Sequence, residues 1–234
     1  MCDKGEVMYS MQGKLVVITG IDGSGKTVQT KLLYERLLKE GRPVVAVDFP
    51  QYGKTFFADM VTKYLRGEFG MADSVNPYLA ALLYAGDRWE VKERITAWLE
   101  EGKFIISNRY VCDNMAHQGG KFNSASEKEA FFQWLDTLEH KVFAIPRSTL
   151  NILLYVPAEM AYRLVEKKGQ RDYLAGEKKD IHEKDINHLR CAQQTFLEIA
   201  KGKKDWIIID CTKDGVLLPE KTVADMVWRA IEAP

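Results

Sequence analysis

The residues most suggestive of chemistry lie near the amino terminus, where an apolar run passes abruptly into glycines. Residues 20–27 read GIDGSGKT and fit the pattern G-x-x-x-x-G-K-[ST] between a strand-like and a helix-like segment, the setting of a phosphate-binding loop. Glycines let consecutive backbone N–H groups point at phosphate oxygens, and the helix end adds about half a positive charge. We therefore expect a bound nucleoside triphosphate, held by Gly20, Gly23, Ser24, Gly25, Lys26 and Thr27.

Two side chains of this loop have distinct expected roles. Lys26 reaches the β- and γ-phosphates, and the hydroxyl of Thr27 binds Mg²⁺, whose charge offsets that of the triphosphate. The loop alone does not separate a kinase from a switch GTPase or a motor ATPase. The chain lacks an N-K-x-D motif and a D-x-x-G after a later strand, and it is too short for a motor with appended domains. These absences favour a small kinase.

The elements that must position this loop are visible as short apolar runs. Because the runs are apolar throughout rather than alternating, they are typical of parallel strands covered on both faces. Helical patterns lie between them, so we expect a three-layer α/β sandwich with a five-stranded parallel sheet. The predicted strands span residues 15–19, 43–49, 103–107, 150–156 and 205–210.

Helix boundaries are predicted from apolar spacing and capping residues. From Thr27 onward, leucines that include Leu33, Leu37 and Leu38 share one stripe, and Gly41 supplies the stop. Ser126 with Glu129 forms a capping-box pattern, and Asp180 with Glu183 forms a second one before a long helix that reaches Ala200.

Length and composition favour one enzyme-sized domain at residues 14–234, with residues 1–13 as an extension. The 33 basic and 33 acidic side chains cancel, which argues against a nucleic-acid or anionic-membrane partner. The four cysteines lack zinc-site spacing, and no signal or membrane segment is apparent, so we expect a cytoplasmic protein. A densely charged stretch at 165–185 is either a solvated loop or a mobile cationic lid.

Several segments, taken in order, resemble the thymidylate kinase family over most of the chain. The marks are the phosphate loop with its acid, DFPQYG (48–53), LLYAGDRWE (82–90), NRYVCDNMAHQGG (108–120) and the charged stretch. The resemblance implies the fold of P-loop nucleoside monophosphate kinases and transfer of the ATP γ-phosphate to dTMP, giving dTDP and ADP in dTTP synthesis. It also implies Mg²⁺ as cofactor and a homodimer.

Tyr84 and Arg88 are four residues apart, so on a helix they share one face and can present a ring and a guanidinium to one planar ligand. The resemblance assigns the ring to stacking on thymine and the arginine to its O4, which disfavours the amino group of cytosine. The alternative is a core aromatic and a surface ion-pair partner.

Arg109 follows a predicted strand and is expected at the sheet edge where ligands of open α/β folds bind. Its guanidinium can donate two parallel hydrogen bonds to a phosphate. The resemblance makes it the clamp on the acceptor phosphate and places Asp22 near the sugar hydroxyl and metal-bound water, so that Asp22 joins Thr27 as a metal-site residue. The implied dTMP site consists of Asp22, Phe49, Tyr52, Tyr84, Arg88, Arg109, Asn114, His117 and Gln118. For Phe49 and Tyr52 ordinary packing is the alternative.

The expected chemistry needs no general base, because the acceptor phosphate monoester is already an anion. Catalysis then rests on positioning and on positive charge from Lys26 and Arg109, with Asp22 beside them. Some family members carry a basic residue inside the loop, but Gly23 and Ser24 occupy those positions here. We therefore expect the lid to supply a cation, with Arg171 first and then Lys168 and Lys167.

Three positions depart from the commoner family pattern and leave rival functions open. Asn108 replaces an aspartate, Gln51 replaces a basic residue, and His117 stands where many members have a tyrosine that crowds the sugar 2′ position. The rivals are a deoxynucleoside monophosphate kinase of broader base preference, accepting dUMP or dGMP, and a non-catalytic nucleotide-binding homologue.

Overall fold

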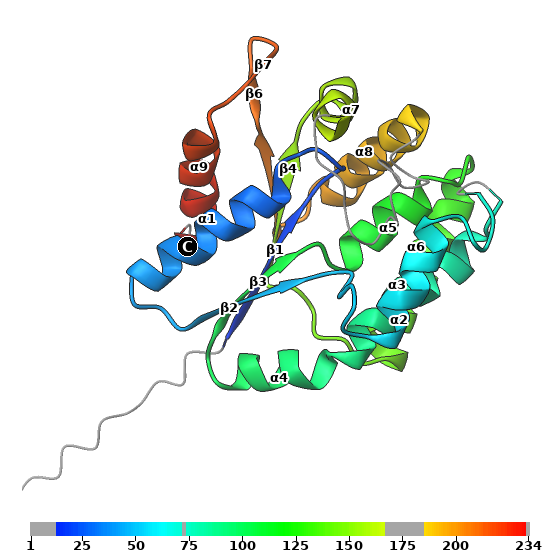
Figure 1. Ribbon diagram of the computed structural model, residues 1–234, viewed down its shortest axis with the longest axis horizontal. Coiled ribbons are helices and arrows are strands. Elements are labelled where there is room, and N and C mark those ends of the chain that lie inside the picture. Colours follow the sequence, from blue (N-terminus) through cyan, green and yellow to red (C-terminus); the bar gives the residue numbers. More distant parts are fainter. Residues whose placement is uncertain (1–12, 72–73, 167–184, 233–234) are drawn as a thin grey trace, which may run out of the picture.

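The structure, a computed structural model, describes residues 13–71, 74–166 and 185–232 (Figure 1). Within these ranges a five-stranded sheet has the strand order β2–β3–β1–β4–β5, and all neighbouring pairs are parallel. The predicted sheet and its five strands are therefore confirmed. The strands are β1 (Lys14–Thr19), β2 (Val44–Asp48), β3 (Phe104–Asn108), β4 (Leu150–Tyr155) and β5 (Trp206–Asp210).

Helices cover both faces of the sheet (Figure 1). Helices α1 and α9 lie on one face, and α3, α4, α5 and α8 lie on the other, with α2 packed on α3 and α6 packed on α5. A short antiparallel hairpin, β6 (Thr212–Lys213) with β7 (Val216–Leu217), follows β5. The helices are α1 (Lys26–Lys39), α2 (Phe56–Leu65), α3 (Pro77–Glu90), α4 (Lys92–Glu100), α5 (Val111–Gly119), α6 (Ala125–Thr137), the π-helix η1 (Leu138–Val142), α7 (Ala158–Glu166), α8 (Ile186–Ala200) and α9 (Glu220–Glu232).

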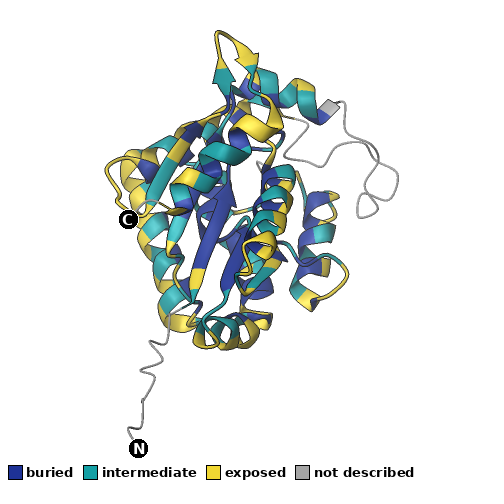
Figure 2. Ribbon diagram, turned by 90° about the vertical axis from the view of Figure 1, so that its left-hand side faces the viewer, coloured by how far each residue is buried: buried dark blue, intermediate teal, exposed yellow. Residues whose placement is uncertain are grey.

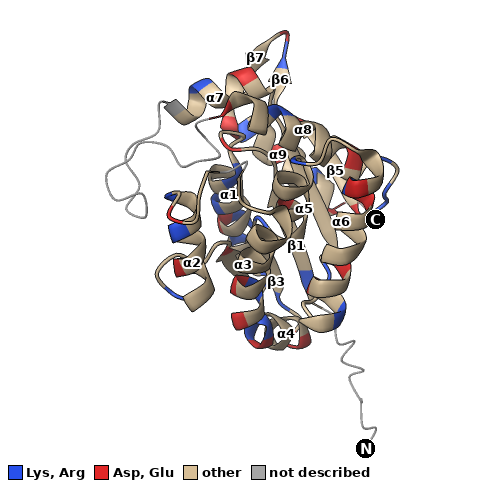
Figure 3. Cartoon of the chain, turned by 90° about the vertical axis from the view of Figure 1, so that its right-hand side faces the viewer, with Lys and Arg blue, Asp and Glu red and all other residues tan. Residues whose placement is uncertain are grey.

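The central strand shows why the apolar runs were continuous. Leu15 and Val17 of β1 pack in the cluster beneath α4, whereas Val16 and Ile18 pack in the cluster beneath α1 and α9. All four side chains are almost completely buried, so both faces of the strand had to be apolar (Figure 2). Charged residues of both signs are interspersed on the outer helices (Figure 3).

Two helix details differ from the sequence prediction. Leu38 is 50% exposed because the buried stripe of α1 runs through Leu33 and Leu37. Helix α6 begins two residues earlier than the predicted capping box, because Ser124 is the residue in extended conformation whose hydroxyl accepts from Glu127 N. Helix α8 does reach the predicted end, and its cap is Asp185; the predicted cap Asp180 lies outside the described residues.

The strand register brings three loops to one edge of the sheet. Asn108, at the carboxyl end of β3, is in register with Ile18 of β1 and with Asp48 of β2. The loops that follow these strands therefore emerge side by side, which is where ligands of open α/β sheets bind. No helix within the described ranges combines the length and apolar character needed to cross a membrane.

Candidate active site

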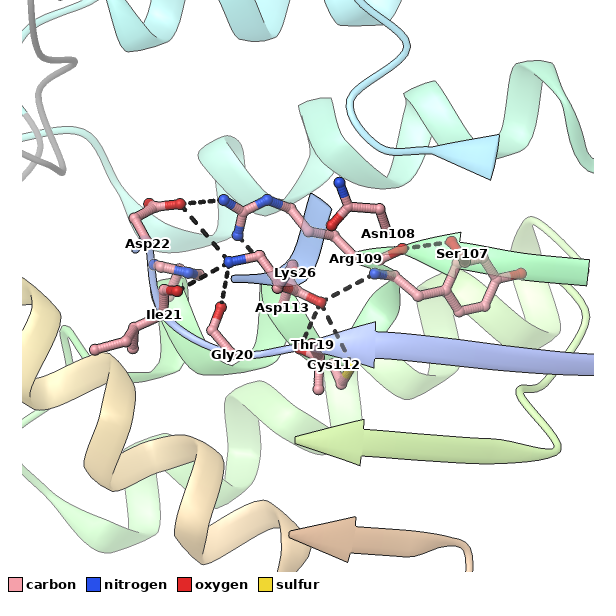
Figure 4. Close-up of polar contacts among 12 residues, drawn as sticks. Thr19, Gly20, Ile21, Asp22, Lys26, Ser107, Asn108, Arg109, Cys112 and Asp113 are labelled. Atoms are coloured by element: carbon pink, nitrogen blue, oxygen red, sulfur yellow. Dashed lines mark hydrogen bonds and ion pairs between the residues drawn. The ribbon is translucent and has the colours of Figure 1, made fainter. Parts of the chain in front are cut away.

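The phosphate loop connects β1 to α1 and is held open by glycine conformations. Gly23 and Gly25 have φ of 90° and 91°, values that side chains rarely adopt. Lys26 curls back over the loop: its Nζ donates to Gly20 O at 2.7 Å and to Ile21 O at 2.9 Å (Figure 4). The ammonium group thus lies over the loop that is predicted to cradle phosphates.

Arg109 occupies the turn between β3 and α5 with a φ of 69°, an uncommon conformation for a non-glycine residue that is enriched at functional sites. Its guanidinium bonds to the carboxylate of Asp22 and lies 3.3 Å from that of Asp113 (Figure 4). Burial disfavours its charged form, but the two carboxylates more than compensate and raise the pKa of Arg109. Arg109 therefore stays protonated and supplies a permanent positive charge at the sheet edge.

Asp22 faces both cations of the site. Its carboxylate lies 3.8 Å from Lys26 Nζ and accepts from Arg109. Burial alone would raise the pKa of Asp22, but the charges of Arg109 and Lys26 hold it well below its usual value. The carboxylate is therefore ionised at neutral pH. It connects the phosphate loop to Arg109 in the turn after β3.

Two oxygens at the mouth of the loop suit a hard cation. Asn108 donates from Nδ2 to Thr27 Oγ1 at 3.4 Å, and its own Oδ1 is buried with no hydrogen-bond partner among the described residues. Hydroxyl and amide oxygens are ligand types that Mg²⁺ accepts, either directly or through its waters. Thr27 and Asn108 therefore fit the expected ion; Asp22 as a second metal-site residue stays a prediction.

A cavity lies beside Arg109 on the side of α3 and α5. The structure brings together here all nine residues predicted to bind dTMP, and Pro50, Leu65, Tyr110 and Asp113 complete the lining. Gln51 lines neither this cavity nor the groove over the phosphate loop that is described below. Its backbone N–H donates to Asp87, and its Nε2 donates to Asp48 O.

We call this space the acceptor cavity. Neighbouring residues outside its lining contact some of its polar side chains. Asn114 Nδ2 donates to Ala81 O at 2.9 Å, whereas Asn114 Oδ1 and Gln118 Oε1 are buried without a hydrogen-bond partner among the described residues. His117 stacks on His188 of α8, with 3.1 Å between His117 Nδ1 and His188 Nε2. Burial lowers the pKa of both rings, to about 4 for His188, so both are neutral at pH 7 and one must donate to the other.

Tyr84 and Arg88 line the acceptor cavity from the same face of α3. Arg88 is also paired with a carboxylate, but that partner is the fully buried Glu139, and Arg88 itself is only 2% exposed. The alternative of a surface ion pair is therefore wrong for Arg88. Tyr84 is partly buried and meets Tyr64 edge to face, so it has a packing role as well as a place in the cavity.

A second, larger groove runs over the phosphate loop. Residues 22–29 line its floor, and apolar side chains that include Leu217, Leu218 and Val223 line its far end. The groove shares Asp22, Phe49, Pro50, Tyr52 and Arg109 with the acceptor cavity. Ligands in the two spaces would meet at Asp22 and Arg109.

Some site residues were missed, and others cannot be placed. The predicted lid cations Arg171, Lys168 and Lys167 lie outside the described residues. Sequence reasoning missed Asp113 and Glu139. Asp113 had a signal, since it is an acid in the first turn of α5, and it accepts from Tyr110 N at 3.0 Å and from Thr19 Oγ1 at 2.8 Å. This network fixes the carboxylate that holds Arg109.

Comparisons with known proteins agree with the family resemblance of the sequence. A sequence model of the thymidylate kinase family matches residues 18–219. The thymidylate kinase of Mycobacterium tuberculosis is 31% identical over 206 residues, which are 86% of this chain and 92% of that protein. A probable thymidylate kinase of Pyrococcus abyssi is 31% identical over 216 residues, 92% of this chain and 96% of that protein. The solved structure of thymidylate kinase from Candida albicans has the same fold, with a TM-score of 0.69 at 24% identity, covering 94% of this chain and 92% of its own.

Proposed function

This chain belongs to the thymidylate kinase family, whose activity is the phosphorylation of dTMP, and we propose that it transfers the γ-phosphate of ATP to dTMP, giving dTDP and ADP in dTTP synthesis. The observation that carries the proposal is the junction of two cavities. The phosphate groove and the acceptor cavity share Asp22 and Arg109. A donor over Lys26 and an acceptor beside Tyr84 would present their phosphates to each other across that junction.

Positioning and positive charge suffice for this chemistry. The acceptor phosphate is already anionic, so the residues need only bring two anions into line and reduce their repulsion. Lys26 leaves its carbonyl partners for the donor phosphates, and Arg109 turns from Asp22 to the acceptor phosphate. Asp22, released from Arg109, would face the sugar hydroxyl and the metal site. Thr27 and Asn108 would hold Mg²⁺, which would compensate the charge of the donor.

The acceptor cavity supports recognition of a thymine nucleotide. Tyr84 offers a ring for stacking and Arg88 offers donors to a carbonyl oxygen. Asn114 and Gln118 contribute buried amide oxygens that would otherwise stay unsatisfied, which favours a ligand with matching N–H or O–H groups. Phe49 and Tyr52 wall the sugar and phosphate. Because Gly23 and Ser24 leave the loop without a basic side chain, Arg171, with Lys168 behind it, is the proposed lid cation.

A kinase of broader base preference is the second candidate, and His117 separately favours weaker rejection of ribonucleotides. The imidazole is smaller than the tyrosine common at this position, so the cavity is less crowded near the sugar. The structural study of the Candida albicans enzyme concerns the origin of a broad substrate specificity in that protein. A non-catalytic homologue is disfavoured, since a pure binder has little use for a second cavity that ends on an arginine. By family likeness we also propose a cytoplasmic homodimer.

The deciding experiment measures ADP formation by the purified protein with ATP, Mg²⁺ and one of several monophosphates. The panel consists of dTMP, dUMP, dGMP, dCMP and the ribonucleotide ribothymidine monophosphate. We expect turnover with dTMP to dominate. Lys26→Ala is the control and should lower kcat at least about a hundredfold, because it removes the ammonium group that stabilises the negative charge of the transferred phosphate. Comparable turnover with dGMP would support the broader kinase, and no turnover with any monophosphate would support the binder.

A further inference from the structure

Arg88 and Glu139 form a buried, two-bond ion pair behind the acceptor cavity. Arg88 Nε donates to Glu139 Oε2 at 3.0 Å, and Nη2 donates to Oε1. The side chains are 2% and 0% exposed. Burial alone would lower the pKa of Arg88, but Glu139 more than offsets this and raises it.

The position of Glu139 in the fold is unusual for an acid. Phe131 and Leu135 form the buried stripe of α6, and Glu139 continues it at the same spacing of four into the π-helix η1. Glu139 is the buried residue of η1, and its backbone is anchored by Ile145 N, which donates to Glu139 O at 2.8 Å. π-Helical turns occur frequently at functional sites. Apolar residues in place of both Arg88 and Glu139 would serve the core as well, since a buried ion pair adds little net stability, whereas loss of one partner alone leaves a buried unpaired charge.

The geometry divides the guanidinium between partner and cavity. Glu139 engages the edge formed by Nε and Nη2, which leaves the edge formed by Nη1 and Nη2 for a ligand. Arg88 lines the acceptor cavity, whereas the fully buried Glu139 is not among the described residues that do so. The rings of Phe49 and Tyr110 each lie 6.0 Å from the guanidinium carbon and restrict its remaining freedom.

We propose that Glu139 is a positioning residue for base selection: it locks Arg88 as a fixed double donor, so that the cavity accepts a base with a carbonyl oxygen and rejects one with an amino group at that place. This inference rests on the proposed function, because it deepens the recognition of the acceptor base. It assigns no role to Glu139 in phosphoryl transfer itself.

The test measures binding of dTMP, dCMP and ATP to the wild type and to Glu139→Gln by titration calorimetry. The amide can accept only one of the two arginine bonds, so Arg88 gains freedom. We expect the Kd of dTMP to rise about tenfold, while the Kd of dCMP and of ATP stays within about twofold. Kinetics should show the same split, with a raised KM for dTMP, an unchanged KM for ATP and a smaller effect on kcat.

The matched control is Asp136→Asn, which breaks the two-bond pair of Asp136 with Arg147, an exposed pair outside the cavity. It should leave all three affinities unchanged. If Glu139→Gln does not fold, Glu139→Asp keeps the charge and withdraws it by one methylene, and it should lower the dTMP preference by a smaller factor.

An unchanged ratio of dTMP to dCMP affinity in a folded variant would overturn the inference, as would an equal loss for all three nucleotides, the mark of a merely structural role. Binding does not require turnover. A wild type that binds dTMP selectively but does not phosphorylate it would thus refute the proposed function and leave the inference standing.

Discussion

Gly23→Ala should abolish most phosphoryl transfer, because the space beside Gly23 is taken by the backbone of α7. A Cβ at this position would lie 2.3 Å from Ala161 O, whereas ordinary contact begins at 3.4 Å. The phosphate loop and α7 would have to separate by about 1 Å. Displacement of a substrate-positioning group by about 1 Å can cost about a hundredfold in rate, so we expect kcat/KM to fall by about that factor.

The matched control is Gly41→Ala, which separates backbone strain from the clash. Gly41 has a φ of +70°, and a Cβ there would meet nothing within 4 Å. Both variants should lose about 1–2 kcal/mol of unfolding free energy, since alanine disfavours this conformation. Denaturant unfolding and ADP formation measured on the same preparations distinguish the two effects. The reasoning fails if Gly23→Ala retains its activity, or if Gly41→Ala loses as much activity as Gly23→Ala does.

Two further predictions concern the groups behind the site. Burial, with the charge of Lys121 added, lowers the pKa of His188 from 6.5 to about 4. Between these pH values the unfolded chain takes up a proton that the folded chain refuses, so stability falls as the pH is lowered from 6.5 to 4, by about 3 kcal/mol from this residue. Denaturant unfolding across this range should show a smaller fall for His188→Gln, and an equal fall would contradict the assignment. Asp113→Asn should lower kcat about tenfold, because an amide cannot keep both its acceptor bonds and the charge that holds Arg109; steady-state assays with dTMP test this, and an unchanged kcat would show that Asp22 alone positions Arg109.

Much of the scaffold could be predicted because its signals are local. Five continuous apolar runs indicated a sheet buried on both faces, and the glycine-rich loop was readable from spacing alone. Arg109 was placed at the ligand-binding edge of the sheet by the rule that parallel strands end at one edge. Capping was less predictable, since Ser124 and Ser126 are equally good caps and only the chain path into α6 selects the first.

The supporting residues of the site carried weaker signals, because each acts through a partner distant in sequence. Glu139 meets Arg88 across 51 residues, and His188 meets His117 across 71. No spacing rule connects such pairs. An acid that continues the spacing of Phe131 and Leu135 is a signal for a buried carboxylate that needs a cation, but the signal does not say which arginine supplies it.

The charge balance at the junction explains why a further cation is required for the proposed reaction. Lys26 and Arg109 face Asp22 and Asp113, so their positive charges are compensated by carboxylates in this structure. Two incoming phosphates must therefore displace carboxylates as well as bind. A basic side chain within the loop would solve the problem, yet Gly23 is closed off by α7 and the Ser24 side chain is buried. Packing around the loop therefore favours a cation from another segment, and Arg171 stays the predicted candidate.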